Sequence, residues 1–321
     1  MPLAEFDLIR EFFSNSTASR DDVILGVGDD CALLQPPAGM EMAITTDTLV
    51  EEVHFSPGTD PEALGHKSLA VNLSDLAAMG AQPSWVTLAL TMPASDPDWL
   101  KGFSRGFLTL AQKHHVALIG GDTTSGPLSI TVTAHGFVEP HKAIRRSGAK
   151  VGDQIYVTGS LGDAGLALLV RQGGYTPGDG LSQLEQRLDR PQPRLAAGQA
   201  LNSIATAAID ISDGLISDLG HICERSGVGA QVYLDQIPTS TQVKRYLQQG
   251  GDWGVVVAAG DDYELCMMVS PAQEPLLEAI SSELDCDLTL VGEMVAGTEV
   301  ACIQPDGSVV TEFTSGYQHF T

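Results

Sequence analysis

Five apolar, strand-like stretches of this 321-residue chain are each followed at once by aspartate. They read VILGVGDD, MAITTD, VALIGGD, TAAIDISD and VVVAAGDD, and they are spread from residue 23 to residue 262. Aspartate is a common turn residue and helix cap, so a single stretch of this kind indicates little. The strand ends of an open α/β sheet meet at one edge, however, and ligands bind there. The recurrence therefore predicts a sheet protein whose acidic side chains gather near a common site.

Strand-like and helix-like segments alternate along the first half of the sequence. We expect strands over 41–50, 84–92, 116–122 and 128–138. One helix is expected to begin at Asp60 and Pro61 and to stop at Gly80, and another to run from Asp96 to about residue 115. Aspartate and proline are typical of helix starts, and glycine of helix ends. The pattern indicates an α/β (α+β mixed) fold in two domains.

A polar segment over 139–153 separates the two halves. It contains four of the 17 basic residues, namely Lys142, Arg145, Arg146 and Lys150. We therefore predict domains over 1–140 and 150–321. The second half is expected to contain strands at 154–159, 206–212, 230–235, 253–260, 263–270, 287–292 and 298–303. Its helices are expected at 162–172, 193–205, 213–226, 240–249 and 271–283, with a glycine-rich loop at 171–183.

The charge and the apolar pattern exclude several classes of partner. The net charge of −24 argues against nucleic acid and anionic membranes as partners. No stretch approaches the roughly 20 apolar residues of a membrane span. The N-terminal segment MPLAEFDLIREFF lacks the basic start of a signal peptide, and the five cysteines show no CxxC spacing. We therefore expect a cytoplasmic protein with reduced thiols.

Aspartate-rich stretches with no histidine or cysteine partners indicate a hard cation such as Mg²⁺. For Asp29 and Asp30 alone, a solvated turn is the simpler interpretation. In the helix over 61–79, the residues Ser68, Asn72 and Asp75 share one face, which lies either at a solvent edge or at a polar site. The sequence contains no G-x-x-x-x-G-K-[ST] loop and no protein-kinase signature. An acidic site of this kind holds a polyphosphate only when metal ions lie between the two.

Seven motifs resemble the thiamine-monophosphate kinase family of the aminoimidazole-ribonucleotide-synthetase-like superfamily. They are GVGDDCALL, ITTDTLVEEVHF, KSLAVNLSDLAAMGAQP, LIGGDTTSGPLSITVTAHG, RRSGAKVGDQIYVTG, DISDGL and GDDYEL. They occur in family order over nearly the whole chain. The resemblance implies ATP-dependent phosphorylation of thiamine monophosphate to thiamine diphosphate. It also implies a homodimer in which the N-terminal domains join their sheets, with a C-terminal α/β domain that closes the active site.

The resemblance also implies roles for single residues. It implies several magnesium ions held by Asp30, Thr45, Thr46, Asp47, Asp75, Asp122, Asp210 and Asp213, with Asp47, Asp122 and Asp210 acting in catalysis through the metal. It implies contacts to ATP from Gly121, Arg146 and Ser212. It implies contacts to thiamine monophosphate from His54, Asp261 and Tyr317. The family usually reads GEDYEL where this chain reads GDDYEL, so Asp261 is one methylene shorter than the usual glutamate.

Other activities stay open at this point. An aminoimidazole ribonucleotide synthetase or a selenophosphate synthetase shares the ATP-binding aspartates but uses another acceptor. A metal-dependent phosphatase also gathers aspartates at strand ends, and a non-catalytic calcium-binding protein is the weakest rival. The acceptor of a thiamine-monophosphate kinase is a phosphate monoester, whose second pKa near 6 leaves it mostly dianionic at pH 7. Direct in-line transfer without a general base is therefore expected.

Overall fold

The computed structural model describes residues 5–14, 18–310 and 313. The chain divides into two compact units, one comprising 1–76 and 81–141 and the other comprising 77–80 and 142–321. We call them unit 1 and unit 2. Tyr317 lies outside the described residues.

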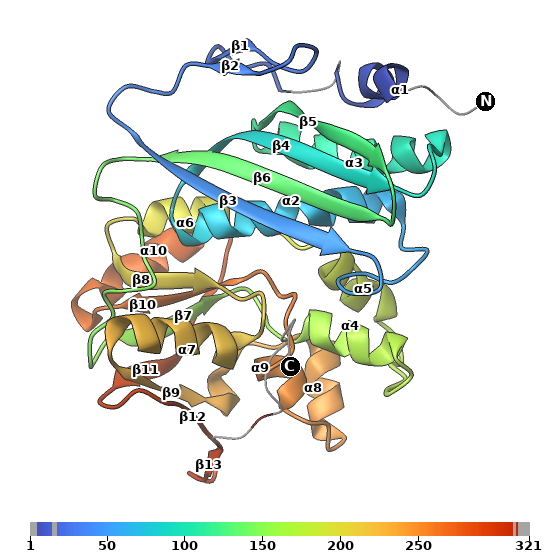
Figure 1. The fold of residues 1–321 in the computed structure, drawn as a ribbon. Helices are drawn as coiled ribbons and strands as arrows, with labels where there is room; N and C mark the ends of the chain where they lie inside the picture. Colours follow the sequence, from blue (N-terminus) through green and yellow to red (C-terminus); the bar gives the residue numbers. More distant parts are fainter. Residues whose placement is uncertain (1–4, 15–17, 311–312, 314–321) are drawn as a thin grey trace. The chain divides into compact units, whose positions relative to one another are not determined.

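Unit 1 is built on a four-stranded sheet with the order β3-β6-β4-β5 (Figure 1). β3 and β4 are antiparallel to β6, and β5 is parallel to β4. Helices α2 and α3 lie on one face of this sheet. In chain order the elements are α1 (Glu5–Phe12), β1 (Val23–Leu25), β2 (Leu33–Leu34), β3 (Glu41–Val50), α2 (Pro61–Ala78), β4 (Gln82–Met92), α3 (Pro97–Lys113), β5 (Ala117–Ser125) and β6 (Ser129–Val138).

Helices α2 and α3 pack closely because glycine stands at their contacts. A Cβ atom on Gly65 would fall 2.0 Å from the Phe103 carbonyl oxygen, and one on Gly106 would fall 1.9 Å from the Glu62 carbonyl oxygen. The helix starts predicted from sequence are confirmed. The Asp60 carboxylate accepts the Ala63 N–H at 3.0 Å, and α2 begins at the next residue. This packing fixes the position of α2 over the sheet.

Unit 2 contains a seven-stranded sheet with the order β13-β12-β9-β11-β7-β10-β8. The strands are β7 (Gln154–Thr158), β8 (Ala205–Asp210), β9 (Gly229–Tyr233), β10 (Leu265–Val269), β11 (Leu288–Val295), β12 (Val300–Ile303) and β13 (Val309–Val310). The helices are α4 (Asp163–Arg171), α5 (Leu181–Asp189), α6 (Leu195–Leu201), α7 (Leu215–Ser226), α8 (Thr241–Gln248), α9 (Gly254–Val257) and α10 (Glu274–Leu284), with short 3₁₀ turns at Leu234–Gln236 and Pro271–Gln273.

The strand directions of unit 2 bring two loops to the same edge of the sheet. β10 is antiparallel to both β7 and β8, so β7 and β8 run parallel and end at the same edge. Helix α7 contacts β8, β9 and β12, while α5, α8 and α9 contact α4. The loops that follow β7 and β8 therefore lie at one edge, as expected for a site at the ends of strands.

The mixed α/β fold predicted from sequence is confirmed, but two of its segments are different from the prediction. The expected strand over 253–260 is wrong, because the chain forms the short helix α9 followed by a loop. Val256 and Val257 are fully buried there, and a short buried apolar run does not distinguish strand from helix by periodicity. The expected loop over 171–183 also ends earlier than predicted, because α5 begins at Leu181.

None of the helices in the described part of the chain has the length and apolar character needed to cross a membrane.

Candidate functional site

Strand β3 and helix α2 bring three of the predicted metal ligands together in unit 1. Side chains alternate between the two faces of a strand, so Thr45 and Asp47 share the face that α2 covers. The Thr45 hydroxyl donates a hydrogen bond to the Asp75 carboxylate of α2. Thr46 lies on the opposite face, where its hydroxyl is 3.0 Å from the Thr133 hydroxyl on β6.

The two carboxylates of this cluster interact unfavourably in the absence of a cation. Burial first, and then the negative charge of Asp75, raise the pKa of Asp47 to about 7. Both effects disfavour the ionised form of a carboxyl group. A divalent cation between the two carboxylates would reverse this balance, because it replaces repulsion by attraction.

The helix face that bears Asp75 continues as a buried polar row. Ser68 and Asn72 are 1% and 0% exposed. The Asn72 amide donates to the Ser68 carbonyl oxygen at 3.2 Å, but its own Oδ1 has no hydrogen-bond partner among the described residues. Of the two interpretations that the sequence left open, the structure supports a polar site. An unpaired buried amide oxygen near a carboxylate can accept a hydrogen bond from a water that is bound to a cation.

A pocket of about 550 Å³ lies at the β5 side of unit 1. Asp29 and Asp30 line it from the loop after β1, and Gly121 and Asp122 line it from β5. Asp30 is exposed, and its N–H donates to the Asp29 carboxylate at 2.8 Å. Gly121 has φ +155°, and a Cβ atom there would fall 1.8 Å from the Leu88 carbonyl oxygen, so the backbone conformation requires glycine.

The acidic residues of unit 1 that were predicted as metal ligands form two separate clusters within one copy of the chain. The register across the sheet pairs Asp47 with Val132, Val132 with Leu88, and Leu88 with Gly121. Three inter-strand spacings separate Asp47 from this part of β5, which is about 14 Å. Asp122 pairs with Ala89, one position further along, and so lies on the opposite face from Asp47. Asp30 and Asp122 therefore line one pocket, while Thr45, Asp47 and Asp75 form the other cluster.

The candidate residues of unit 2 are held together by main-chain hydrogen bonds. The Asp261 N–H donates to the Ser212 carbonyl oxygen at 2.9 Å, and the Tyr263 N–H donates to the Ile211 carbonyl oxygen at 2.8 Å. A Cβ atom on Gly260 would fall 2.0 Å from the Ser212 carbonyl oxygen, so only glycine allows this approach. The loop that follows β8 and the loop that precedes β10 therefore form one paired structure. It contains four of the predicted site residues, namely Asp210, Ser212, Asp213 and Asp261.

Asp218 of α7 supports the loop after β8. One of its carboxylate oxygens accepts the N–H groups of Ser212 and Asp213, both at 3.0 Å. Burial is the largest influence on this carboxyl group and raises its pKa to about 7, while the positive charge of Arg146 acts in the opposite direction. Arg146 therefore lies near this loop, and its side chain is exposed.

The backbone around Asp261 adopts an unusual conformation that two buried acids hold in place. Asp261 and Tyr263 have φ values of +70° and +50°, in the left-handed region. Aspartate enters this region more readily than most side chains, so Asp261 fits the backbone at the position where the family usually has glutamate. The neighbouring Asp262 is 4% exposed, and both its carboxylate oxygens accept the Gly162 N–H at 3.1 Å.

Glu264 is the second of these acids and is fully buried. Arg187 Nη2 donates to Glu264 Oε1 at 2.5 Å, and Arg194 donates to both Glu264 oxygens at 2.6 Å. The Thr158 hydroxyl donates to Glu264 Oε2 at 2.5 Å. Sequence reasoning missed Asp218, Asp262 and Glu264, because their anchoring roles depend on partners far away in the chain. Their only sequence signal is their place in or near two motifs: Asp262 and Glu264 lie within GDDYEL, and Asp218 follows DISDGL.

His54 occupies the turn after β3 in unit 1. Its Nδ1 accepts the Val50 N–H at 3.0 Å, so this hydrogen bond fixes the neutral ring with the proton on Nε2. The ring is half-buried. The third residue expected to contact the acceptor, Tyr317, falls outside the described residues.

The donor atoms at the candidate site are suitable for magnesium. They are carboxylate and hydroxyl oxygens, with no cysteine or histidine beside them at the cluster of Thr45, Asp47 and Asp75. Among the described residues, no three side chains of histidine, cysteine, aspartate or glutamate converge as a ready metal site. Mg²⁺ usually binds through one or two carboxylates together with waters and substrate phosphates.

Two family models match the chain. Residues 28–138 match the N-terminal domain of AIR synthase related proteins, and residues 150–303 match their C-terminal domain. Curated relatives match over the full length. The thiamine-monophosphate kinase of Salmonella typhimurium is 48% identical and covers 100% of this chain and 99% of its own length. That of Bacillus subtilis is 34% identical, with coverage of 98% and 99%.

Solved structures resemble the chain in fold and in sequence. The thiamine-monophosphate kinase of Stenotrophomonas maltophilia superposes with a TM-score of 0.87 at 46% identity, covering 97% of this chain and 99% of its own. The structure of AaThiL complexed with AMPPCP and TMP has a TM-score of 0.77 at 30% identity and covers 92% of each chain. The hydrogenase maturation protein HypE of E. coli, at 20% identity and a TM-score of 0.79, shares the fold.

Proposed function

Because the chain belongs to the thiamine-monophosphate kinase family of AIR synthase related proteins, we propose that it transfers the γ-phosphoryl group of ATP to thiamine monophosphate and forms thiamine diphosphate. The observation that supports this most strongly is the relationship to a structure that holds AMPPCP and TMP together, at 30% identity over 92% of this chain. AMPPCP is an analogue of ATP, so that complex presents both reactants.

The transfer proceeds directly between the two bound reactants. The acceptor phosphate of thiamine monophosphate is mostly dianionic at pH 7 and is itself the nucleophile. No side chain is needed to remove a proton from it, which is consistent with an acidic site. Phosphoryl transfer depends chiefly on positioning and on charge neutralisation. The work of this chain is therefore to align two anionic reactants in line and to hold the cations that reduce their repulsion.

Magnesium is the cation that fits the donor atoms of the site. When bound, it neutralises phosphate charge and reduces the repulsion between the reactants. We assign its ligands among the oxygens of Asp30, Thr45, Thr46, Asp47, Asp75, Asp122, Asp210 and Asp213. Thr46 directs its hydroxyl to the opposite face of β3 from Asp47, so its main-chain oxygen is the atom proposed.

The contacts to the two reactants follow the family motifs. Gly121, Arg146 and Ser212 are proposed to contact ATP. The absence of a side chain at Gly121 lets β5 pass close to the Leu88 carbonyl oxygen, beside Asp122 at the wall of the pocket. His54, Asp261 and Tyr317 are proposed to contact thiamine monophosphate.

Arg146 is expected to act on ATP binding and not on folding. Its side chain is exposed and lies near the loop of Ser212 and Asp213. Replacing it with alanine should raise the KM for ATP by about tenfold or more, because a charge-assisted contact to phosphate is lost. Arg145→Ala is the matched control, since Arg145 is the exposed neighbour. Steady-state kinetics at varied ATP checks this. An unchanged KM in Arg146→Ala places the residue outside the nucleotide site.

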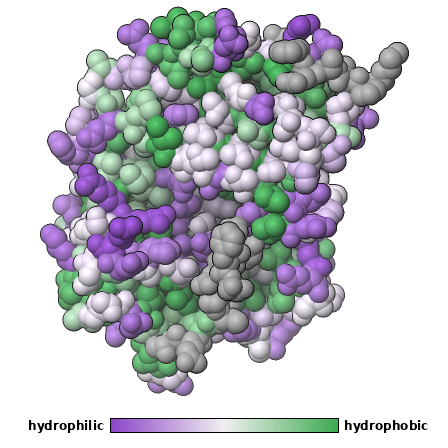
Figure 2. Space-filling model, viewed as in Figure 1, coloured by the Kyte–Doolittle hydropathy of each residue, from purple (hydrophilic) through white to green (hydrophobic). Residues whose placement is uncertain are grey.

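We propose that the chain forms a homodimer in which the unit 1 sheets of two copies meet through the exposed residues of β3. β3 and β5 are the edge strands of this sheet. On the face away from α2 and α3, Val23, Leu34 and Met40 pack against Trp85 and Phe137, whereas the β3 side carries exposed side chains. Ile44 is 59% exposed and Met42 is 42% exposed on β3. Figure 2 shows mostly pale, weakly polar residues over this part of the molecule. An exposed ten-residue edge strand of this composition is a surface for pairing with a second copy.

Light scattering tests the dimer. The wild-type protein is expected at twice the monomer mass of 33.8 kDa. Ile44→Asp places a charge on the proposed interface and should shift the protein to monomer at micromolar concentration, whereas Val309→Asp, at a comparably exposed site on unit 2, should not. A wild-type protein that is monomeric at all concentrations contradicts the proposal.

A coupled assay with ATP, Mg²⁺ and thiamine monophosphate tests the activity itself. We expect ADP and thiamine diphosphate in equal amounts, with the product identified by chromatography. ADP release only with another acceptor would indicate a different synthetase of the superfamily, and phosphate release without ATP would indicate a phosphatase. The biosynthetic reaction and the negative charge of the chain support a cytoplasmic location, which we also propose.

A further inference from the structure

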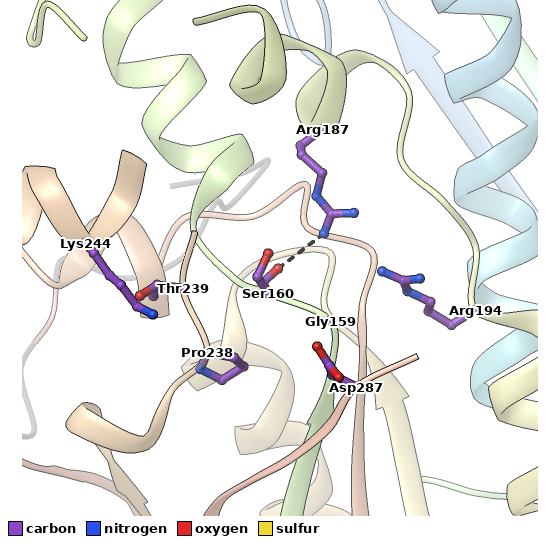
Figure 3. Close-up of a pocket in the computed structure, with 8 residues that line it drawn as sticks. All are labelled: Gly159, Ser160, Arg187, Arg194, Pro238, Thr239, Lys244 and Asp287. Carbon is purple, nitrogen blue, oxygen red and sulfur yellow. Dashed lines mark hydrogen bonds between the residues drawn. The ribbon is translucent and has the colours of Figure 1, made fainter. Parts of the chain in front are cut away.

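Unit 2 contains a second pocket, which none of the residues assigned to ATP or thiamine monophosphate lines. Its volume is about 440 Å³ (Figure 3). Gly159 and Ser160, after β7, form part of its wall, and Asp287 lies beside them. The remaining lining residues are Arg187, Arg194, Pro238, Thr239 and Lys244. Figure 3 shows the two arginines extending toward Gly159 and Ser160 from one side and Lys244 reaching inward from another.

The pocket gathers three cationic side chains within a strongly negative chain. Arg187, Arg194 and Lys244 contribute three positive charges, and Asp287 contributes one negative charge. The Glu264 carboxylate behind the arginines neutralises one more, because it is 1% exposed and binds both guanidinium groups. Arg187 Nε also lies 3.9 Å from Asp163 Oδ2, so three carboxylates face these three cations, in a chain whose net charge is −24. Lys244 is exposed, and its side chain has neither an ion pair nor a hydrogen bond within the described part of the chain.

The two arginines are held in place by hydrogen bonds, and each keeps N–H groups that these bonds do not use. Arg187 uses Nη2 for both Glu264 and the Ser160 carbonyl oxygen, and Arg194 uses Nε and Nη2 for Glu264. The Nη1 group of each has no hydrogen-bond partner among the described residues. Both side chains are 23% exposed, so these donors are accessible from the pocket. A guanidinium whose rotamer is already held loses little entropy when it binds an anion.

The backbone at Gly159 allows this arrangement. Gly159 has φ +57°, and a Cβ atom there would fall 2.4 Å from Glu264 Oε1 and 2.7 Å from Arg194 Nη2. Any side chain would therefore displace the pair from the wall of the pocket. The absence of a side chain leaves the guanidinium of Arg194 directly against the loop after β7.

We propose that this pocket binds the phosphoryl group of a small phosphorylated molecule. The free Nη1 groups of two preorganised guanidiniums can donate hydrogen bonds to the oxygens of a phosphate, and a lysine ammonium adds a mobile third cation. Glu264 and Asp163 account for the charges of the two arginines, whereas the Lys244 side chain faces the same space without an ion pair among the described residues. The proposal does not depend on the kinase activity, because it rests on residues that the reaction does not use.

Calorimetric titration with inorganic phosphate and with inorganic diphosphate, in magnesium-free buffer, tests the site. We expect saturable binding to the wild-type protein. Lys244→Gln should weaken it by about tenfold or more, because one charge-assisted contact is lost. Arg245→Gln is the matched control: Arg245 is the exposed neighbour on α8, carries the same charge and does not line the pocket. Lys244 makes no contact needed for folding, so the variant is expected to fold normally.

The outcomes separate the alternatives. Stronger binding of diphosphate than of phosphate identifies a diphosphate group as the occupant, and equal binding identifies a single phosphoryl group. The proposal is overturned if the wild-type protein shows no saturable binding, or if Lys244→Gln binds as tightly as the wild type. Equal weakening in Lys244→Gln and Arg245→Gln would also overturn it, since general electrostatic attraction would then explain the binding. The kinase assay on the same three proteins reports independently whether the proposed activity holds.

Discussion

Replacement of Asp47 by asparagine is expected to lower turnover by about 100-fold or more and, at the same time, to stabilise the ligand-free protein. The loss of turnover follows from removing a carboxylate that we assign to the cation site, since losing one strong electrostatic stabiliser costs roughly this much. The gain in stability follows from the position of Asp47, which is half-buried and repelled by Asp75. A residue kept only for folding would not show these opposite effects.

The gain in stability has a defined pH dependence. The pKa of Asp47 is about 7 in the folded protein, against 3.8 for an unperturbed aspartate. The folded state therefore binds the proton more tightly than the unfolded state, and the side chain destabilises the fold increasingly as pH rises from about 4 to 7. Asp47→Asn should thus raise the Tm most at pH 8 and have no such effect below pH 4.

Thermal unfolding in EDTA, with steady-state kinetics in Mg²⁺, measures both effects. Glu41→Gln is the control, because Glu41 lies on the same strand, is exposed and loses the same charge. It should leave turnover and Tm nearly unchanged. Near-normal turnover in Asp47→Asn would remove Asp47 from the proposed cation site. A fall in its Tm at pH 8 would contradict the repulsion between Asp47 and Asp75.

Replacement of Glu264 by glutamine is expected to have the largest effect on stability. The carboxylate is fully buried and is bound by Arg187, Arg194 and Thr158. Its loss leaves the partly buried Arg194 without its ion pair and Arg187 with only the longer contact to Asp163, and breaking a buried pair in this way costs about 3–5 kcal/mol. The Glu264 carbonyl oxygen also accepts the Ile211 N–H at 2.8 Å, so the loop after β8 should loosen and activity should fall as well.

Denaturant unfolding followed by circular dichroism measures this loss. Asp189→Asn is the matched control, since it breaks the ion pair with Arg171, whose side chains are 29% and 22% exposed. A pair at the surface contributes about 1 kcal/mol or less. If both variants lose equally little free energy of unfolding, Glu264 is not the anchor of the loop that contains Asp261.

The elements of unit 1 could be predicted because their signals are local. Asp60 and Pro61 begin α2, and Asp96 and Pro97 begin α3, through hydrogen bonds to N–H groups two or three residues away. The β-branched run over 41–50 forms β3 with the predicted bounds. By contrast, the run over 253–260 was assigned the wrong structure, because its burial against α4 and α7 and not its periodicity decides its conformation.

The residue types of the candidate site could be predicted from the sequence, but their positions relative to one another could not. Asp261 and Asp262 are identical neighbours in the sequence, yet one is half-buried and the other is fixed to the Gly162 N–H, 100 residues away. The separation of Asp47 from Asp122 also follows only from the order of the strands. That order places both of them on edge strands, on opposite faces of one sheet.

The amino-acid sequence by itself determined the family, the mixed α/β class and the acidic, oxygen-only chemistry of the site, because these depend on residue type and on short-range patterns. Only the tertiary structure showed which acids lie together and which serve as anchors, and it alone revealed the pocket of Arg187, Arg194 and Lys244. Burial and long-range partners set the protonation of a carboxyl group and the role of a carboxylate or a guanidinium. The neighbouring residues in the sequence reveal neither the burial nor the partners.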